Sequence, residues 1–160
     1  ILIKEICLFS TKEGKVKKKF NFKLPKFIIY GIDTDISGKG INTIKMKDIK
    51  YKKKEFIFFK DSYNKLKDIN FYDKNLISKI SLESLKINQK YFPKKKFHTI
   101  LNIDKKLSHD FIIGAHSGTM IGFVYRYNKK IGNMFKKKDA KLIKDLSKIF
   151  KAPIIKYLHV

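Results

Sequence analysis

The order of the predicted elements in the last two thirds of the chain limits its fold most strongly. Residues 137–150 form the clearest helix, because apolar side chains share one face and lysines cover the other. A second helix is predicted over residues 74–86, which Asp73 can cap. Segments rich in Phe, Ile and Val predict strands around both helices, at residues 55–63, 97–103, 111–127 and 154–160. The order is therefore strand, helix, strand, strand, helix, strand.

This order predicts an α+β domain of the ferredoxin-like, split βαβ class, in which helices pack on one face of an antiparallel sheet. We expect that domain to span residues 55–160. Residues 27–30 also favour a strand, but the rest of residues 1–54 shows no pattern that specifies a fold. We therefore assign residues 1–54 to an irregular N-terminal extension.

The stretch at residues 92–111 stands at the centre of the predicted domain. Lys94, Lys95 and Lys96 precede one predicted strand, and Lys105 and Lys106 separate it from the next. We interpret the stretch as a projecting β-hairpin arm with a cationic tip. Such an arm would meet the phosphate backbone of RNA.

Charge points to the same class of partner. The chain has 38 Lys and Arg against 14 Asp and Glu, a formal net charge of +24, so the folded domain repels itself unless a polyanion or an anionic membrane surface relieves it. Arg126 is the only arginine, and lysine suits contact with phosphate better than readout of bases. An AT-rich genome, such as that of an organelle, would give the same lysine bias. Both causes stay open.

The residue spacing gives little support to a calcium site, a catalytic His–Ser pair or a membrane span. An acidic turn at residues 33–38 imitates a calcium loop, but Ile44 stands where the loop needs a bidentate Glu. His116 and Ser117 are neighbours on a predicted strand and would point to opposite faces. Cys7 is alone, and no apolar run is long enough for a membrane span. We expect no catalytic residue, metal, cofactor or small-molecule substrate.

The motifs at residues 92–111 resemble the universal small-subunit ribosomal protein number ten. That family carries Leu-Pro, a basic stretch and Thr-Val-Leu, followed by an extended tip that contains Val-Asp-Lys-Lys. The corresponding residues here are Phe92-Pro93, Lys94–Lys96, Thr99-Ile100-Leu101 and Ile103-Asp104-Lys105-Lys106. Phe111 and His116 also match family positions, and the resemblance covers about residues 55–160. The family's Ser-Pro-His is missing, which predicts a shorter arm.

The resemblance implies a structural, non-enzymatic constituent of the ribosome in the head of the small subunit. Its partners would be small-subunit ribosomal RNA and ribosomal proteins three, nine and fourteen. The RNA contacts expected on this basis are Lys94, Lys95, Lys96, Lys105, Lys106, His109, His116, Lys129 and Lys130. The composition and the extension favour the mitochondrial matrix, with plastid or cytoplasm as alternatives.

Three other functions stay open from the sequence. The first is another basic ribosomal protein of an organelle. The second is a lysine-rich accessory subunit of an organelle membrane complex, with the amphipathic segment 137–150 on the lipid surface. The third is a nuclease with magnesium ligands among Asp33, Asp35 and Asp48.

Overall fold

A computed structural model describes residues 7–10, 15–20, 22, 25–36, 50–114, 118–128, 132–133 and 137–159. The chain divides into two compact units. One contains the described residues of Ile1–Pro25 and Tyr51–Asp73, and the other those of Lys26–Lys50 and Lys74–Val160. This division does not coincide with the boundary between residues 54 and 55 that the sequence predicted.

The smaller unit contains a strand pair and a helix. Strands β1 (Cys7–Ser10) and β2 (Lys15–Lys19) pair antiparallel. Helix α1 spans Lys53–Asp68, so the strand predicted at residues 55–63 is wrong. Glu55 and Ser62 are buried seven residues apart, a spacing of two helical turns. The Glu55 carboxylate also accepts the backbone N–H of Lys52 at 3.0 Å, which stabilises the start of the helix.

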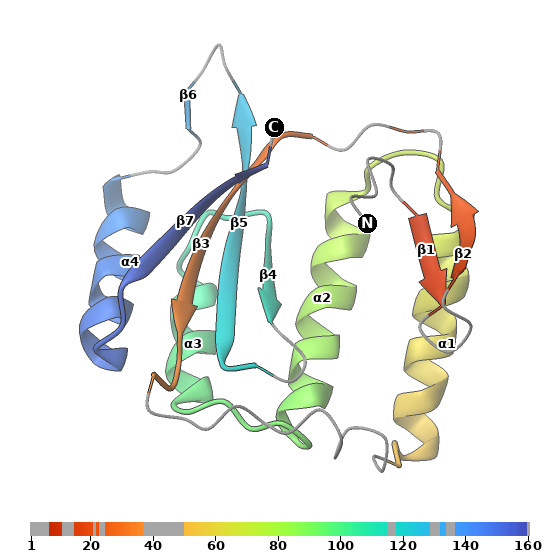
Figure 1. Cartoon of the computed structure of the whole chain (residues 1–160), viewed down its shortest axis with the longest axis horizontal. Helices are drawn as coiled ribbons and strands as arrows, with labels where there is room; N and C mark the ends of the chain where they lie inside the picture. Colours follow the sequence, from red (N-terminus) through yellow and green to blue (C-terminus); the bar gives the residue numbers. More distant parts are fainter. Residues whose placement is uncertain are drawn as a thin grey trace. The chain divides into compact units, whose positions relative to one another are not determined.

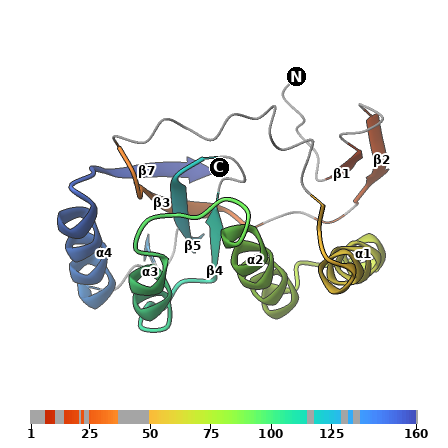
Figure 2. The ribbon, with the colours of Figure 1, turned by 90° about the horizontal axis from the view of Figure 1, so that it is seen from below.

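The larger unit is built on an antiparallel sheet with the strand order β4-β5-β3-β7 (Figure 1). Its strands are β3 (Phe27–Asp33), β4 (Phe111–Gly114), β5 (Met120–Asn128) and β7 (Ile154–His159). The short β6 (Gly132–Asn133) pairs with the end of β5. Helices α2 (Lys74–Gln89), α3 (Phe97–Asp104) and α4 (Lys137–Phe150) all lie on one face of this sheet (Figure 2).

The connections confirm the predicted α+β, split βαβ class. Strand β5 lies between β3 and β4, which are connected through α1, α2 and α3, and β3 lies between β5 and β7, which are connected through β6 and α4. The residues that form the individual strands of this fold differ from the prediction. The first strand is β3, which the sequence placed in the N-terminal extension, and the central hairpin is β4 with β5. Helix α4 begins and ends as predicted.

Residues 97–104 form α3, so the strand predicted at residues 97–103 and the projecting β-hairpin arm predicted over residues 92–111 are wrong. Ile100 and Ile103 are buried in the core, and Phe97 and Leu107 pack against it. The spacing of these four side chains is helical. In a segment this short, alternating and helical patterns of apolar residues both fit, and only the packing partners decide between them.

The core lies between the helices and the inner face of the sheet. Alternate residues of β3 and β5 point into it, among them Tyr30 and Tyr125, whose rings meet edge to face at 5.7 Å. Helix α4 contributes Ile143 and Leu146, both buried. Its apolar face therefore belongs to the core.

A buried carboxylate ties the start of α4 to the segment that follows α3. The Asp139 side chain is fully buried and accepts hydrogen bonds from the Ser108 backbone N–H at 3.1 Å and the Ser108 hydroxyl at 2.5 Å. Burial raises the pKa of the Tyr125 phenol, and the neighbouring Asp139 charge raises it further. Asp139 thus holds residues 105–110 against the helix.

Replacement of Asp139 tests this tie. Asp139→Ala should lower the free energy of unfolding by about 1–3 kcal/mol, because it removes the acceptor of both Ser108 hydrogen bonds. Asp145→Ala is the matched control on the same helix, and it should change stability by less than about 0.5 kcal/mol. Urea unfolding at pH 7 measures both values. Equal losses for the two variants would contradict a special role for Asp139.

Candidate nucleic-acid interface

Lysines line the solvent face of α4 from its first residue to just past its last. Lys137, Lys141, Lys144 and Lys148 are exposed and follow one another at helical spacing, and the exposed Lys151 continues the series. We call these five residues the α4 lysine stripe. None of them forms an ion pair within the part of the chain that the structure describes.

The α4 lysine stripe is electrostatically unfavourable in the isolated protein. Like charges three or four residues apart on a helix cost about 0.2–0.5 kcal/mol per pair. Asp145 lies one turn from Lys141 and Lys148 but is ion-paired to neither. A polyanion placed along the helix would turn this repulsion into attraction.

The stripe ends at a hollow of about 350 Å³. Three segments that are far apart in the sequence form its walls: the turn after β3, the start of α3 and the end of α4. The lining residues are Thr34, Asp35, Ile36, Lys95, Lys96, Ile149, Phe150 and Lys151. We call this site the basic hollow, because three ammonium groups share it with one carboxylate.

The lysines of the basic hollow are positioned by specific contacts. The Lys95 ammonium lies 2.8 Å from an Asp35 carboxylate oxygen, but its side chain is 62% exposed, so solvent weakens the pair. The Lys96 ammonium donates to the Ile149 carbonyl at 3.0 Å and lies 5.9 Å from the centre of the Phe150 ring. Lys96 therefore caps the C-terminus of α4, where a cation is favoured. An anion entering the hollow would meet donors from several directions.

Lys95 and Lys96 both line the basic hollow, whereas Lys94 does not. The Lys94 side chain is 4% exposed, and burial lowers the pKa of its ammonium. The side chain of Gln89 accepts the Lys94 backbone N–H at 2.8 Å and donates to its carbonyl at 3.1 Å. Lys94 is packed inside the fold and does not face a ligand.

The remaining predicted contacts divide into three groups. Lys105 and Lys106 are exposed just past the end of α3. His109 is mostly buried: its Nε2 lies 2.8 Å from an Asp104 carboxylate oxygen, and its ring meets Phe123 edge to face. This contact serves packing, and it leaves His109 unable to reach a phosphate. His116, Lys129 and Lys130 lie outside the described residues.

The contacts predicted from the sequence do not include Lys141, Lys144, Lys148 or Lys151. The lysine face of the predicted helix was visible, and it is the signal that could have identified the first three residues. No local pattern marks Lys151, because its place in the basic hollow depends on segments more than fifty residues away.

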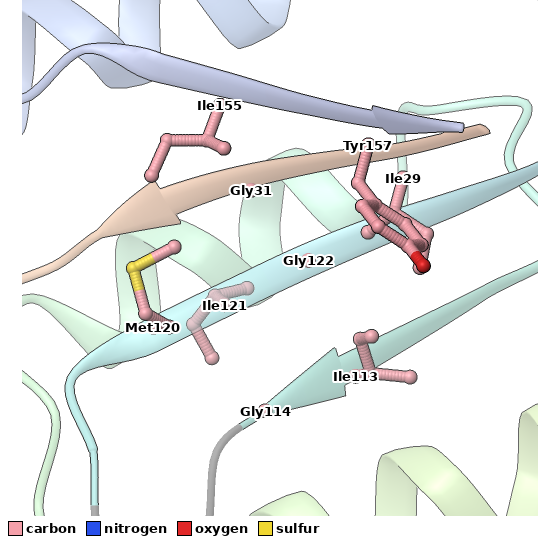
Figure 3. Close-up of a pocket in the computed structure, with 9 residues that line it drawn as sticks. All are labelled: Ile29, Gly31, Ile113, Gly114, Met120, Ile121, Gly122, Ile155 and Tyr157. Carbon is pink, nitrogen blue, oxygen red and sulfur yellow. The ribbon is translucent and has the colours of Figure 1, made fainter. Parts of the chain in front are cut away.

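The outer face of the sheet carries a second hollow, of about 390 Å³, and none of the nine residues that line it is charged (Figure 3). Gly31 and Gly122 are paired across β3 and β5 in its floor, and a Cβ added to Gly122 would stand 2.9 Å from Ile29. Tyr157 and Ile155 on β7 are 60% and 52% exposed and also line it. This hollow offers dispersion contacts and one phenol hydroxyl, but no carboxylate, imidazole or cationic side chain.

Comparisons with known proteins leave the chain without a relative. No protein-family model, curated protein or solved structure matches it. Within the described ranges, no group of three or more His, Cys, Asp and Glu side chains is arranged to hold a metal ion. No described helix combines the length and the apolar character needed to cross a membrane.

The burial of Lys94 leads to a testable difference from its neighbour. Lys94→Met should leave the affinity for single-stranded RNA within about twofold of wild type, whereas Lys95→Met should lower it by about fivefold at 0.1 M salt. Fluorescence anisotropy with a labelled oligonucleotide measures both. A larger loss for Lys94→Met than for Lys95→Met would contradict the assignment.

The stability of the Lys94→Met variant should also depend on pH differently from that of wild type. Burial places the pKa of Lys94 below the usual 10.5 in the folded state, so the unfolded state binds its proton more tightly. The resulting penalty is complete below the lowered pKa and disappears as the pH rises towards 10.5. The stability of Lys94→Met relative to wild type should therefore fall between pH 7 and 10.5, as followed by thermal unfolding.

Proposed function

We propose that this protein is a non-catalytic, RNA-binding constituent of a ribonucleoprotein, and specifically of the small ribosomal subunit of a mitochondrion. The observation that carries the proposal is the α4 lysine stripe, which runs without ion-paired partners among the described residues into the basic hollow. Arrays of exposed lysines are electrostatic footprints for a nucleic-acid backbone.

The chemistry favours phosphate contacts over base readout. Lysine ammonium groups act as point charges on phosphate, whereas base readout relies on the planar fork of arginine. The only arginine of the chain, Arg126, donates through its side chain to an Asp110 carboxylate oxygen at 3.0 Å. Lys74 lies 3.1 Å from the same oxygen. Binding should therefore depend on charge and shape more than on base sequence.

The ribosomal part of the proposal rests on the resemblance to small-subunit protein number ten. The arm that the resemblance implied over residues 92–111 is not formed, because residues 97–104 are helical. Over residues 55–160 the structure has helices α1, α2 and α3 where the resemblance implied a strand, a helix and a strand, and the order agrees only from β4 onwards. Ribosomal RNA and ribosomal proteins three, nine and fourteen enter the proposal through the resemblance alone, whereas the mitochondrial matrix also rests on the composition and on residues 1–54.

Two of the other functions lose specific support. An accessory subunit lying on lipid would need the apolar face of α4, but Ile143 and Leu146 are buried in the core. A nuclease would need free acidic groups. Asp33 accepts the Asp35 backbone N–H at 2.9 Å, Asp35 is paired with Lys95, and Asp48 lies outside the described residues.

The dependence of RNA affinity on salt tests the proposal. For the full chain and a labelled single-stranded RNA, the plot of log affinity against log salt should have a slope of about −3 or steeper, since each phosphate contact contributes about −0.7. Replacing Lys141, Lys144 and Lys148 together with Gln should make the slope less steep by about 2. Anisotropy titrations between 50 and 300 mM salt measure the slope.

A matched control separates the stripe from charge in general. Lys53, Lys60 and Lys65 are exposed on α1, and replacing them with Gln removes the same charge elsewhere. This triple variant should leave most of the slope intact. A wild-type slope near zero, or equal changes in the two triple variants, would argue against the proposed interface.

A further inference from the structure

We infer that the basic hollow is a phosphate subsite for RNA, and that Lys96 and Lys151 hold strained backbone conformations in order to form it. The inference rests on the proposed function, because RNA supplies the phosphate. It goes further by assigning one phosphodiester group to a particular site. It also accounts for the positive φ angles of Lys96 and Lys151, which charge alone does not explain.

The strain is confined to this site. Among the described residues, two that are not glycine have a positive φ: Lys96 at 49° and Lys151 at 53°. Both line the basic hollow. The left-handed region is unfavourable for residues with a Cβ, and Asn, Asp or Gly normally occupy it. Such outliers persist where the surrounding structure maintains them, often for a functional reason.

Lys151 occupies a position where glycine is the usual residue. Its backbone N–H donates to the Lys148 carbonyl at 3.3 Å, and the Ala152 N–H donates to the Ser147 carbonyl at 3.1 Å. This pair of bonds is the glycine-type termination of an α-helix. Glycine would make the same bonds with less strain. What lysine adds is an ammonium group where the α4 lysine stripe meets the basic hollow.

Lys96 belongs to another wall of the basic hollow and has the same left-handed backbone conformation, here at the start of α3. Its side chain reaches the Ile149 carbonyl at the end of α4. The two strained lysines therefore flank the same helix terminus from different segments. Lys95, whose ammonium is paired with Asp35, also lines the hollow and adds a third ammonium. A phosphodiester carries one negative charge and several acceptor oxygens, which suits donors that converge from separate walls.

The most informative variant is Lys151→Gly, because loss of the backbone strain should raise the stability whereas loss of the ammonium should lower the affinity for RNA. Removing the strain should raise the Tm by about 2–4 °C. Removing the ammonium should lower the affinity for a labelled single-stranded RNA by about fivefold at 0.1 M salt, and make the salt slope less steep by about 0.7. A residue that only terminates the helix would change stability without changing the salt slope.

Two further variants complete the experiment. Lys151→Arg keeps the charge and the strain, so both Tm and affinity should stay close to wild type. Lys79→Ala removes one exposed charge from α2, away from the hollow, and should leave the salt slope unchanged within error. Thermal unfolding and anisotropy titrations on the full chain give all the values.

The outcomes distinguish a failure of the phosphate subsite from a failure of the proposed RNA-binding function. If wild type binds RNA with a steep salt slope but Lys151→Gly behaves like Lys79→Ala in binding, the phosphate subsite is overturned and RNA binding stands. If Lys151→Gly lowers the Tm, the strain argument is overturned. If wild type shows no salt-dependent affinity for RNA, the proposed function itself fails and the subsite falls with it.

Discussion

The excess of positive charge is the constraint on which the rest of this structure depends. A chain with a net charge of +24 folds only if its apolar residues form a core that outweighs the repulsion. Helix α4 shows how the two requirements meet, because Ile143 and Leu146 are buried on one face while the α4 lysine stripe occupies the other. Four exposed lysines of α4 and the adjoining Lys151 are thereby aligned along one face, an arrangement that suits a polyanion.

The fold class was predictable because it depends on periodicity and order. Helix α4 has a helical pattern over fourteen residues, and its bounds agree with the prediction. The failures occur in short segments rich in Phe and Ile, at residues 55–63 and 97–103, where propensity favours strands but the structure has helices. At residues 97–103 the core contacts of Ile100 and Ile103 fix the helix. Strand β3 was missed as the central strand because its partners, β5 and β7, come about ninety residues or more later in the chain.

The site was predictable only in part, for a related reason. Lys94, Lys95 and Lys96 are equivalent in the sequence, yet one is buried and two line the basic hollow. The difference arises from the backbone. The Gln89 side chain is hydrogen-bonded to the backbone N–H and carbonyl of Lys94, whereas Lys96 has a left-handed backbone conformation. The conformation of Lys151 and its meeting with Lys96 are products of tertiary structure. Charge composition therefore favours a polyanion as the partner, whereas the geometry supports the proposed place of contact.

Sedimentation of the native protein in a density gradient tests the central claim most directly. The account predicts that the protein migrates with small ribosomal subunits at low salt, and that ribonuclease treatment moves it to the top of the gradient. Migration at the top without ribonuclease would contradict the account. So would migration with membrane complexes after detergent extraction.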